Sequence, residues 1–341
     1  MNIVQVGLGS FGKQWMKVIL EDKQWCYTGV ATRKKETLEQ CGRQIGLAKE
    51  AQFDNLEDML LKSQSADAVL ITTPYFQHTE QILLSLQYGK HVLVEKPLCG
   101  SLEEAYQIRD AIKESGKKLM VAENYRFSPG AIFMHDLVKS REIGNPELIF
   151  IQYFVKHRFP DDDWRNNYRY PVLIENATHH FDLLRYITGS EALSVWGSAF
   201  SSDLAKHWAY PSVSIQYEMS DNLNFHFAAS WAYDGFNTPW EGSWRVHGTK
   251  GSIVWDGEAV KVFRDIENLF RDVKFTPKDS LKKVLREFSA ALTENREPAI
   301  DIDDNIKTLH MVFSAIESIE KRRKVVISYY HGLPSAYGAS Y

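Results

Sequence analysis

The sequence predicts an α/β domain with a doubly wound parallel sheet, followed by an α+β domain with a predominantly antiparallel, open-faced sheet. Up to about residue 123, short β-type runs alternate with helical patterns, which is typical of parallel sheets with right-handed crossovers. From about residue 147, long aromatic-rich strand patterns follow one another with short turns, which favours antiparallel pairing. A chain of 341 residues is long enough for two such domains.

The amino-terminal elements alternate regularly. The predicted strands cover 2–6, 27–32, 67–72, 91–95 and 118–122, and the predicted helices cover 11–21, 34–46, 55–63, 78–88 and 102–115. Residues 69–71 and 92–94 are continuously apolar, as expected where helices cover both faces of a sheet. We assign residues 1–123 to this domain.

The second domain is predicted over residues 124–330. Its strand candidates are 148–154, 213–217, 223–227, 244–247, 252–255 and 324–328, and its helix candidates are 175–188, 281–295 and 302–321. Helices on one face would leave the other face rich in exposed aromatic side chains, and self-association commonly buries such faces. We therefore predict a homo-oligomer, a dimer or tetramer, formed through the open sheet face. Residues 331–341, rich in Tyr, Gly and Ser, are expected to form a carboxyl-terminal tail.

Composition and charge argue against several classes of function. A net charge of −4 gives no general attraction to nucleic acid or to an anionic membrane. No apolar run approaches the ~20 residues of a membrane span, and no secretory leader is visible, so we expect a cytoplasmic protein. Cys26, Cys41 and Cys99 follow no metal-binding spacing, so no metal site is expected. Cys26 is expected to be buried in its strand.

The first predicted strand leads into the first helix through glycines spaced G-x-G-x-x-G. Gly7 permits a tight turn, Gly9 lets the backbone approach a pyrophosphate, and Gly12 lets the helix pack closely on the strand. Ser10 and Phe11 lie where the helix begins and where unpaired N–H groups attract phosphate. The segment predicts the binding of a dinucleotide cofactor, with a plain strand-to-helix turn as the alternative.

The end of the second predicted strand bears on which cofactor binds. An acidic residue at this point would bind the ribose hydroxyls of NAD. Thr32 and Arg33 stand here instead, followed by two lysines, and this set suits the 2′-phosphate of NADP. We favour NADP. NAD, or the use of both cofactors, is the alternative, and the cations would then form a solvated basic loop.

Two further strand ends carry candidate residues. The predicted strand 67–72 ends in Thr72, Thr73 and Pro74, with His78 close behind, and the predicted strand 91–95 ends in Glu95 and Lys96. Ligands of open α/β sheets bind at the carboxyl ends of the strands, so these residues are expected to border the cofactor. The alternatives are an ordinary strand-to-helix loop and a solvated Glu–Lys ion pair.

The predicted helix at 175–188 carries three ionisable groups on one face. Glu175, His179 and Asp182 fall at positions i, i+4 and i+7. Such a set can hold an imidazole in one tautomer and shift its pKa, which makes His179 a candidate for proton transfer. A packing histidine is the alternative. We interpret His180, about 100° round the helix, as structural.

With these residues in view, the chain resembles the Gfo/Idh/MocA oxidoreductases over roughly residues 2–328. The resemblance rests on the glycine-rich turn, on Thr73-Pro74 with His78, on the segment 89–97 that ends in Glu95-Lys96-Pro97, and on the helix at 175–182. It continues through segment 124–129, Trp164-Arg165 and segment 248–252.

The resemblance implies an NAD(P)-dependent oxidoreductase with a Rossmann domain. Such an enzyme transfers a hydride between nicotinamide and a carbinol or carbonyl carbon of a sugar, a sugar derivative or a cyclitol. It implies that Lys96 and His179 are catalytic, and which of the two is the formal base is left open. The residues expected to bind substrate are Glu175, Tyr125, Arg126, Trp164, Arg165 and Asp182. Glu175 stands where inositol dehydrogenases carry Asp, and the bulky segment 170–174 replaces a common glycine-rich turn, so no particular sugar is assigned.

Two other functions stay open. One is a glycosidase of the same family that uses bound nicotinamide for transient oxidation and elimination. The other is a non-catalytic, sugar-sensing regulator that binds nucleotide. The presence of both Lys96 and His179 is compatible with the first and argues against the second, since a sensor needs no proton-transfer pair.

Overall fold

The computed structural model describes residues 1–264, 271–274 and 280–329, which group by their contacts into two units. The first contains Met1–Asn124 together with residues 280–306. The second contains residues 125–264, 271–274 and 307–329. The sequence division placed residues 280–306 in the second domain, whereas in the structure they pack with the first.

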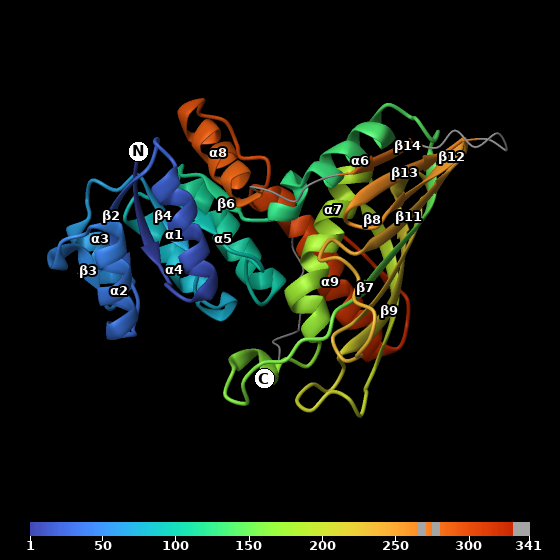
Figure 1. Ribbon diagram of the computed structural model, residues 1–341, viewed down its shortest axis with the longest axis horizontal. Coiled ribbons are helices and arrows are strands. Elements are labelled where there is room, and N and C mark those ends of the chain that lie inside the picture. Colours follow the sequence, from blue (N-terminus) through green and yellow to red (C-terminus); the bar gives the residue numbers. More distant parts are fainter. Residues whose placement is uncertain (265–270, 275–279, 330–341) are drawn as a thin grey trace. The chain divides into compact units, whose positions relative to one another are not determined.

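The described part of the first unit is organised around a six-stranded sheet in which every pairing is parallel (Figure 1). Its strand order is β3-β2-β1-β4-β5-β6. The strands are β1 (Asn2–Val6), β2 (Cys26–Ala31), β3 (Gln52–Phe53), β4 (Ala68–Ile71), β5 (His91–Val94) and β6 (Leu119–Val121). The helices are α1 (Ser10–Glu21), α2 (Lys35–Ile45), α3 (Leu56–Lys62), α4 (His78–Gln87), α5 (Leu102–Ser115) and α8 (Ser280–Thr293).

The order of these strands determines where a ligand site can form. Successive residues of β4 are all buried, so both faces of the sheet are covered. Strand β1 pairs with β2 on one side and with β4 on the other. Strands β2 and β3 therefore extend the sheet to one side of β1, and β4, β5 and β6 extend it to the other. Loops that leave the carboxyl ends of β1, β4 and β5 share one edge of the sheet, where open α/β sheets bind ligands.

Within the described residues, the second unit contains a nine-stranded sheet of order β14-β13-β12-β11-β7-β10-β9-β8-β15. Strands β7 and β10 pair in parallel, and the other pairings are antiparallel. The strands are β7 (Pro146–Phe154), β8 (Ala192–Phe200), β9 (Ser212–Met219), β10 (Asn224–Ser230), β11 (Ser243–Gly248), β12 (Gly251–Trp255), β13 (Ala259–Phe263), β14 (Arg271–Lys274) and β15 (Val325–Val326). The helices are α6 (Pro129–Lys139), α7 (Thr178–Thr188) and α9 (Ile302–Lys321), the last of which begins in the first unit.

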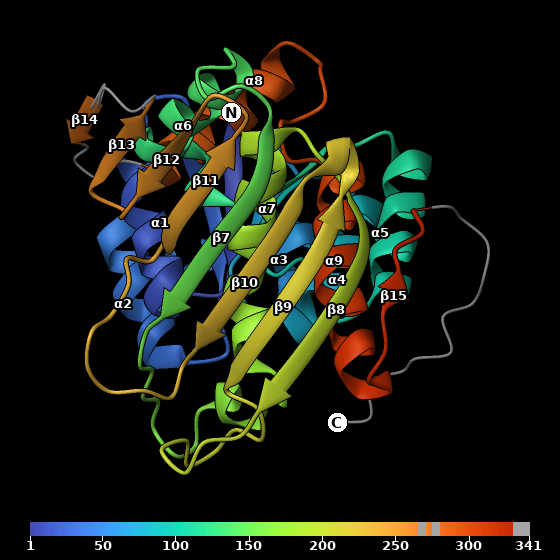
Figure 2. The ribbon, with the colours of Figure 1, turned by 90° about the vertical axis from the view of Figure 1, so that its right-hand side faces the viewer.

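One face of this sheet packs on helices. Figure 2 shows the sheet face-on with α7 and α9 behind it. In β9, Ile215 and Tyr217 are buried while Gln216 and Glu218 between them are exposed. The Tyr217 hydroxyl donates to the backbone oxygen of Met311 in α9, which marks the buried side. Alternation of this kind gives a sheet with one packed face and one outward face.

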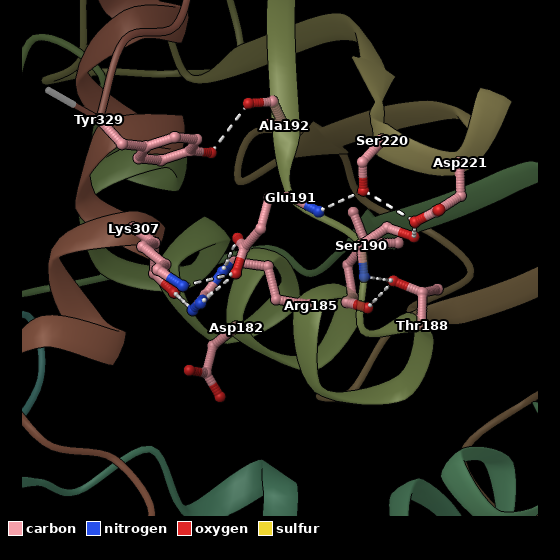
Figure 3. A network of polar contacts seen from close by, with 12 residues as sticks. Asp182, Arg185, Thr188, Ser190, Glu191, Ala192, Ser220, Asp221, Lys307 and Tyr329 are labelled. Atoms are coloured by element: carbon pink, nitrogen blue, oxygen red, sulfur yellow. Dashed lines mark hydrogen bonds and ion pairs between the residues drawn. The ribbon is translucent and has the colours of Figure 1, made fainter. Parts of the chain in front are cut away.

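A polar network fixes the carboxyl end of α7 (Figure 3). Arg185 donates two hydrogen bonds to Glu191, at 2.7 and 3.0 Å, and one to the Thr308 hydroxyl at 3.0 Å. Lys307 donates to the same Glu191 carboxylate at 3.0 Å. Burial raises the pKa of Glu191, but the hydrogen bonds and charges of Arg185 and Lys307 outweigh this effect and lower it below its ordinary value. The network therefore ties α7 to the start of β8 and to α9.

The predicted sheet types are confirmed, but several elements were missed. The sequence patterns did not predict β3, α6, β8, β13 or β14, and the helix expected from residue 175 becomes an α-helix only at Thr178. The expectation that Cys26 is buried is wrong, because this residue is exposed at the first position of β2. The expected tail at 331–341 lies outside the described residues. Among the residues that are described, no helix is long and apolar enough to cross a membrane, and no cluster of His, Cys, Asp or Glu could hold a metal ion.

Candidate active site

The glycine-rich turn joins β1 to α1 in the predicted place. Gly7 has φ of +91°, in the region that favours glycine. A Cβ atom on Gly12 would lie 2.2 Å from the Gly7 carbonyl oxygen, so close packing requires glycine there. Gly9 differs from both: its φ of −68° is ordinary, and a Cβ atom on it would meet no described atom within 4 Å. The fold itself leaves space at Gly9, which suits close approach by a ligand.

The amino terminus of α1 suits an anion. Gly9 is its N-cap and provides no side-chain hydrogen bond, and the first turn of the helix contains no acidic residue. Ser10 and Phe11 begin the helix and are exposed. Backbone N–H groups at such an end carry partial positive charge and bind phosphate. The turn therefore fits the pyrophosphate of a dinucleotide.

The end of β2 presents the predicted cationic segment. Thr32 is half-buried, and its backbone N–H donates to the Phe53 carbonyl oxygen at 3.1 Å. Arg33, Lys34 and Lys35 are exposed, and α2 begins at Lys35. The exposed cations are compatible with a phosphate beside this strand end.

The end of β4 is bound to its neighbours by hydrogen bonds. The Thr72 hydroxyl donates to the Gly7 carbonyl oxygen at 2.5 Å, and the Thr73 hydroxyl donates to Gln81 at 2.6 Å. The ring of His78 is fully buried, with Nε2 2.8 Å from the Thr73 carbonyl oxygen and Nδ1 3.0 Å from that of Pro97. His78 therefore connects the loop after β4, which includes Pro74, to the loop after β5.

The loop after β5 carries Glu95 and Lys96. Glu95 is buried, and Trp15 in α1 donates its indole N–H to the carboxylate at 2.6 Å. Burial raises the pKa of Glu95 to about 7, although the Trp15 hydrogen bond and the Lys96 charge act in the opposite direction. Lys96 is half-buried, and its backbone N–H donates to Glu95 at 3.3 Å. Since β1, β4 and β5 are successive parallel strands of this sheet, Lys96 shares an edge with the glycine-rich turn.

In the second unit, His179 lies in the first turn of α7 against Tyr125. The two rings stack with centroids 4.0 Å apart and planes 17° apart. His179 is 4% exposed, so only a small part of the ring is accessible. Tyr125 belongs to a short 3₁₀ helix, Asn124–Phe127. The stack holds the imidazole in one orientation.

Arg126 and Asp182 bind each other. The guanidinium of Arg126 donates two hydrogen bonds of 2.6 Å to the two carboxylate oxygens of Asp182, and both side chains are buried. This paired geometry is the strong form of an ion pair. It ties the short helix that carries Tyr125 to the helix that carries His179.

Glu175 lies in a π-helical turn, Leu173–Ala177, that precedes α7. Single π turns are frequent at functional sites. The Tyr168 hydroxyl donates to Glu175 at 2.6 Å. The three groups expected on one helix face therefore have three different partners. Glu175 binds Tyr168, whereas His179 and Asp182 contact neighbouring residues of one short helix, Tyr125 and Arg126.

Trp164 and Arg165 lie in another 3₁₀ helix, Trp164–Asn167. Arg165 forms two hydrogen bonds of 2.9 Å with Asp163, and its guanidinium lies 4.2 Å from the ring centroid of Phe159 and 5.3 Å from that of Trp164. Trp164 is half-buried. Its ring offers an apolar surface of the kind that packs on a carbon skeleton.

Three residues near these groups were missed by sequence reasoning. Trp15 binds Glu95, Tyr168 binds Glu175, and Gln5 lies beneath the glycine-rich turn. Only Gln5 gave a signal in the sequence, since it is a polar residue between apolar neighbours in the first strand. Tyr168 and Trp15 are ordinary residues in their segments.

Comparisons with known proteins cover both units. The family model described as "Oxidoreductase family, NAD-binding Rossmann fold" matches residues 1–123, and the one described as "GFO/IDH/MocA C-terminal domain" matches residues 132–254. The chain is 24% identical over 337 residues to myo-inositol 2-dehydrogenase of Thermotoga maritima, covering 95% of this chain and 98% of that protein. It is 32% identical over 165 residues to scyllo-inositol 2-dehydrogenase (NAD(+)) of Bacillus subtilis, which is 48% of this chain and 46% of that protein. A crystal structure of an oxidoreductase from Agrobacterium radiobacter, in complex with NAD+, L-tartaric acid and magnesium, matches with a TM-score of 0.89 and 18% identity, over 96% of this chain and 98% of that one.

Proposed function

The chain belongs to the Gfo/Idh/MocA family of oxidoreductases, and we propose that it transfers a hydride between a nicotinamide cofactor and a carbinol or carbonyl carbon of a sugar, a sugar derivative or a cyclitol. The observation that carries the proposal is the shared sheet edge at which Lys96 stands with the open glycine-rich turn. Relatives named as inositol dehydrogenases support the substrate class.

The residues at this edge fit a dinucleotide. The turn from Gly7 to Gly12, with Ser10 and Phe11, would hold the pyrophosphate, because Gly9 leaves its backbone open and α1 has no side-chain cap. The cofactor would also be bordered by the residues at the ends of β4 and β5, which are Thr72, Thr73, Pro74, His78, Glu95 and Lys96. Thr32 and Arg33 would bind the adenosine ribose, and we propose NADP as the preferred form because a guanidinium pairs well with phosphate.

In the proposed reaction, side chains of the protein carry out the proton transfer. When bound, the nicotinamide supplies or accepts the hydride. Oxidation of an alcohol requires a base at its hydroxyl group, because alcohols are weak acids. We propose that one of two groups, the amine of Lys96 or the imidazole of His179, takes up this proton while the other holds the hydroxyl group by a hydrogen bond. In the reverse direction the same groups polarise the carbonyl and return the proton.

The substrate side of the proposal draws on the second unit. Glu175 would accept a hydrogen bond from a substrate hydroxyl, with its carboxylate held by Tyr168. Tyr125, Trp164 and Arg165 would contact the rest of the substrate. Arg126 and Asp182 form a buried, doubly hydrogen-bonded ion pair, so we propose that they contribute by holding Tyr125 against His179.

A panel of sugars, polyols and cyclitols tests the proposal. Each compound is supplied with NAD or NADP, and each related ketone or aldose with the reduced form, while the absorbance of reduced nicotinamide is followed. Lys96→Ala and His179→Ala are each expected to cut turnover severely while NADH binding, measured by fluorescence, stays largely intact. His135→Ala is the matched control, because this histidine also stacks on a tyrosine but contacts the carbonyl oxygen of Tyr186. Wild-type turnover in both catalytic variants would refute the assignment.

We also propose that the outward face of the second sheet binds a second copy of the chain. The pairing registers place Trp196, Gln216, His226 and Phe150 in one row across four strands. Trp196 is 49% exposed and Phe150 is 37% exposed, and exposed aromatic side chains on an open sheet face are commonly buried by self-association. Light scattering should find an oligomer that Trp196→Glu dissociates. Leu61→Glu is the control, since Leu61 is similarly exposed but lies on α3 of the first unit. A monomeric wild-type protein would refute the proposed self-association. The cytoplasmic location stays a prediction.

A further inference from the structure

Gln5 is a polar side chain in a fully buried position. It lies in β1 between Val4 and Val6, both of which are also buried. Burial of an amide is unfavourable unless its donors and acceptor are paired. The groups that pair with Gln5 therefore indicate what the residue does in the fold.

The Gln5 amide lies beneath the glycine-rich turn. Its Nε2 group donates to the carbonyl oxygens of Gly7 at 3.1 Å and of Gly12 at 2.9 Å. Its Oε1 atom accepts a hydrogen bond from the Tyr27 hydroxyl. Since only the nitrogen of an amide donates, these partners fix the orientation of the side chain. Gln5 thus bridges the start of the turn and the first turn of α1.

Thr72 acts on the same carbonyl group from the neighbouring strand. Its hydroxyl donates to the Gly7 oxygen at 2.5 Å and lies 3.2 Å from Gln5 Nε2. The Thr72 hydroxyl can donate one hydrogen bond and accept another, whereas the two Nε2 hydrogens of Gln5 are shared among three acceptors, the Gly7 and Gly12 carbonyl oxygens and the Thr72 hydroxyl. The register of β1 on β4 pairs Val6 with Ile71 and brings Thr72 beside Gly7.

We infer that Gln5 and Thr72 are positioning residues for the pyrophosphate of the cofactor and act through the turn. In a trans peptide the carbonyl points away from the next N–H group, so a Gly7 carbonyl held by Gln5 directs the Leu8 N–H away from Gln5. A turn ordered before the ligand arrives lowers the entropic cost of binding. The inference rests on the proposed function, because it concerns the turn that would hold the dinucleotide.

Substitutions that remove these donors test the inference. Gln5→Leu and Thr72→Val keep approximate shape and lose the hydrogen bonds, while Thr72→Ser keeps the hydroxyl and serves as the matched control. Dissociation constants are measured for NADH and NADPH by fluorescence and for ADP-ribose, which contains the pyrophosphate without nicotinamide, by calorimetry. We expect the dissociation constants to rise about tenfold for Gln5→Leu and Thr72→Val, and less than about twofold for Thr72→Ser.

The thermal midpoint of each protein without ligand is measured separately. A purely structural role would lower this midpoint and leave the dissociation constants of the folded variants unchanged, and that result overturns the inference while leaving the proposed function intact. If Gln5→Leu does not fold, the comparison of Thr72→Val with Thr72→Ser decides. A wild-type protein that binds neither NADH nor NADPH refutes the proposed function and the inference with it.

Discussion

Replacing Gly9 by alanine should separate binding of the cofactor from folding. The backbone of Gly9, with φ −68° and ψ −169°, is one that alanine adopts without strain. The added Cβ atom would meet no described atom within 4 Å. Alanine is a poorer N-cap than glycine, but it reduces the entropy of the unfolded chain, so the two effects partly offset each other. We expect the free energy of unfolding to change by less than about 1 kcal/mol.

The matched control is Gly12→Ala, for which the structure predicts the opposite outcome. Its Cβ atom would lie 2.2 Å from the Gly7 carbonyl oxygen and 2.8 Å from the Thr72 hydroxyl, well inside ordinary contact distances. Overpacking in a rigid region costs about 1–3 kcal/mol or more. Gly12→Ala should therefore lower the stability and the binding of the cofactor together.

Urea unfolding followed by tryptophan fluorescence measures stability, and titration with NADH and NADPH measures binding. For Gly9→Ala we expect wild-type stability and affinity at least about tenfold weaker, because the methyl group would occupy the space into which the pyrophosphate fits. A Gly9→Ala protein that binds either cofactor as tightly as wild type would show that the pyrophosphate does not approach Gly9. An unstable Gly9→Ala protein would refute the packing argument instead.

Three further substitutions test other parts of the site. Arg33→Asp should weaken the use of NADP at least about tenfold and spare NAD, in steady-state kinetics with each cofactor, because it replaces a phosphate-binding cation by an anion; equal losses with both would contradict the NADP assignment. Glu95 has a pKa of about 7 in the folded protein against an ordinary 4.5, so between these pH values the folded protein keeps a proton that the unfolded chain releases. The free energy of unfolding of the wild type should therefore fall by about 3 kcal/mol as the pH rises from about 4.5 to 7. Glu95→Gln keeps an acceptor for Trp15 and should abolish this loss in urea unfolding, and a parallel pH dependence in the two proteins would exclude Glu95 as its source. Asp182→Leu leaves the Arg126 charge buried without its carboxylate and should cost about 3–5 kcal/mol, while the double variant with Arg126→Met should recover much of it, which a double-mutant cycle measures.

The glycine-rich turn was predictable because its causes are local. Gly7 and Gly12 are needed by a turn between a strand and a helix that both show in the hydrophobic pattern, and observed β1 and α1 differ from the predicted elements by at most one residue. The strand ends at Thr72 and Lys96 were predictable for a related reason. A parallel sheet places the carboxyl ends of its central strands on one edge whatever their loops contain.

Elements whose stability comes from distant partners were harder to predict. Helix α8 packs with the first unit because Phe288 stacks on Trp25 and the Ser289 hydroxyl accepts a hydrogen bond from the Trp25 indole. Trp25 and Ser289 are 264 positions apart in the sequence. The start of α6 did carry a local signal, since Ser128 caps it and Pro129 follows. Its buried residues Ala131, Met134, Leu137 and Val138 also recur at helical spacing, so this missed helix was predictable from the sequence.

The π turn at Leu173–Ala177 explains why the predicted helix face was only partly informative. A face of residues i, i+4 and i+7 assumes an unbroken α-helix, whereas the wider turn changes the direction of Glu175 relative to His179 and Asp182. Nothing in the residue types of this segment signals the change. The pattern identified the residues that gather in this region but not the partners of each.

Buried polar groups show where such partners come from. Trp15 and Glu95 are 80 positions apart, Gln5 and Thr72 are 67 apart, and Arg126 and Asp182 are 56 apart. In each pair, the residue that comes first in the sequence has no visible partner nearby. Its role becomes clear only when the fold brings the later residue into contact with it. For Gln5 the strand order already suffices, because β1 lies beside β4 in every sheet of this order and Thr72 must then follow Ile71 to the level of Gly7. For Arg126 and Asp182 no sheet register fixes the distance, so their pairing needed the packed structure. The pairing supports the proposal that these residues orient Tyr125 and His179.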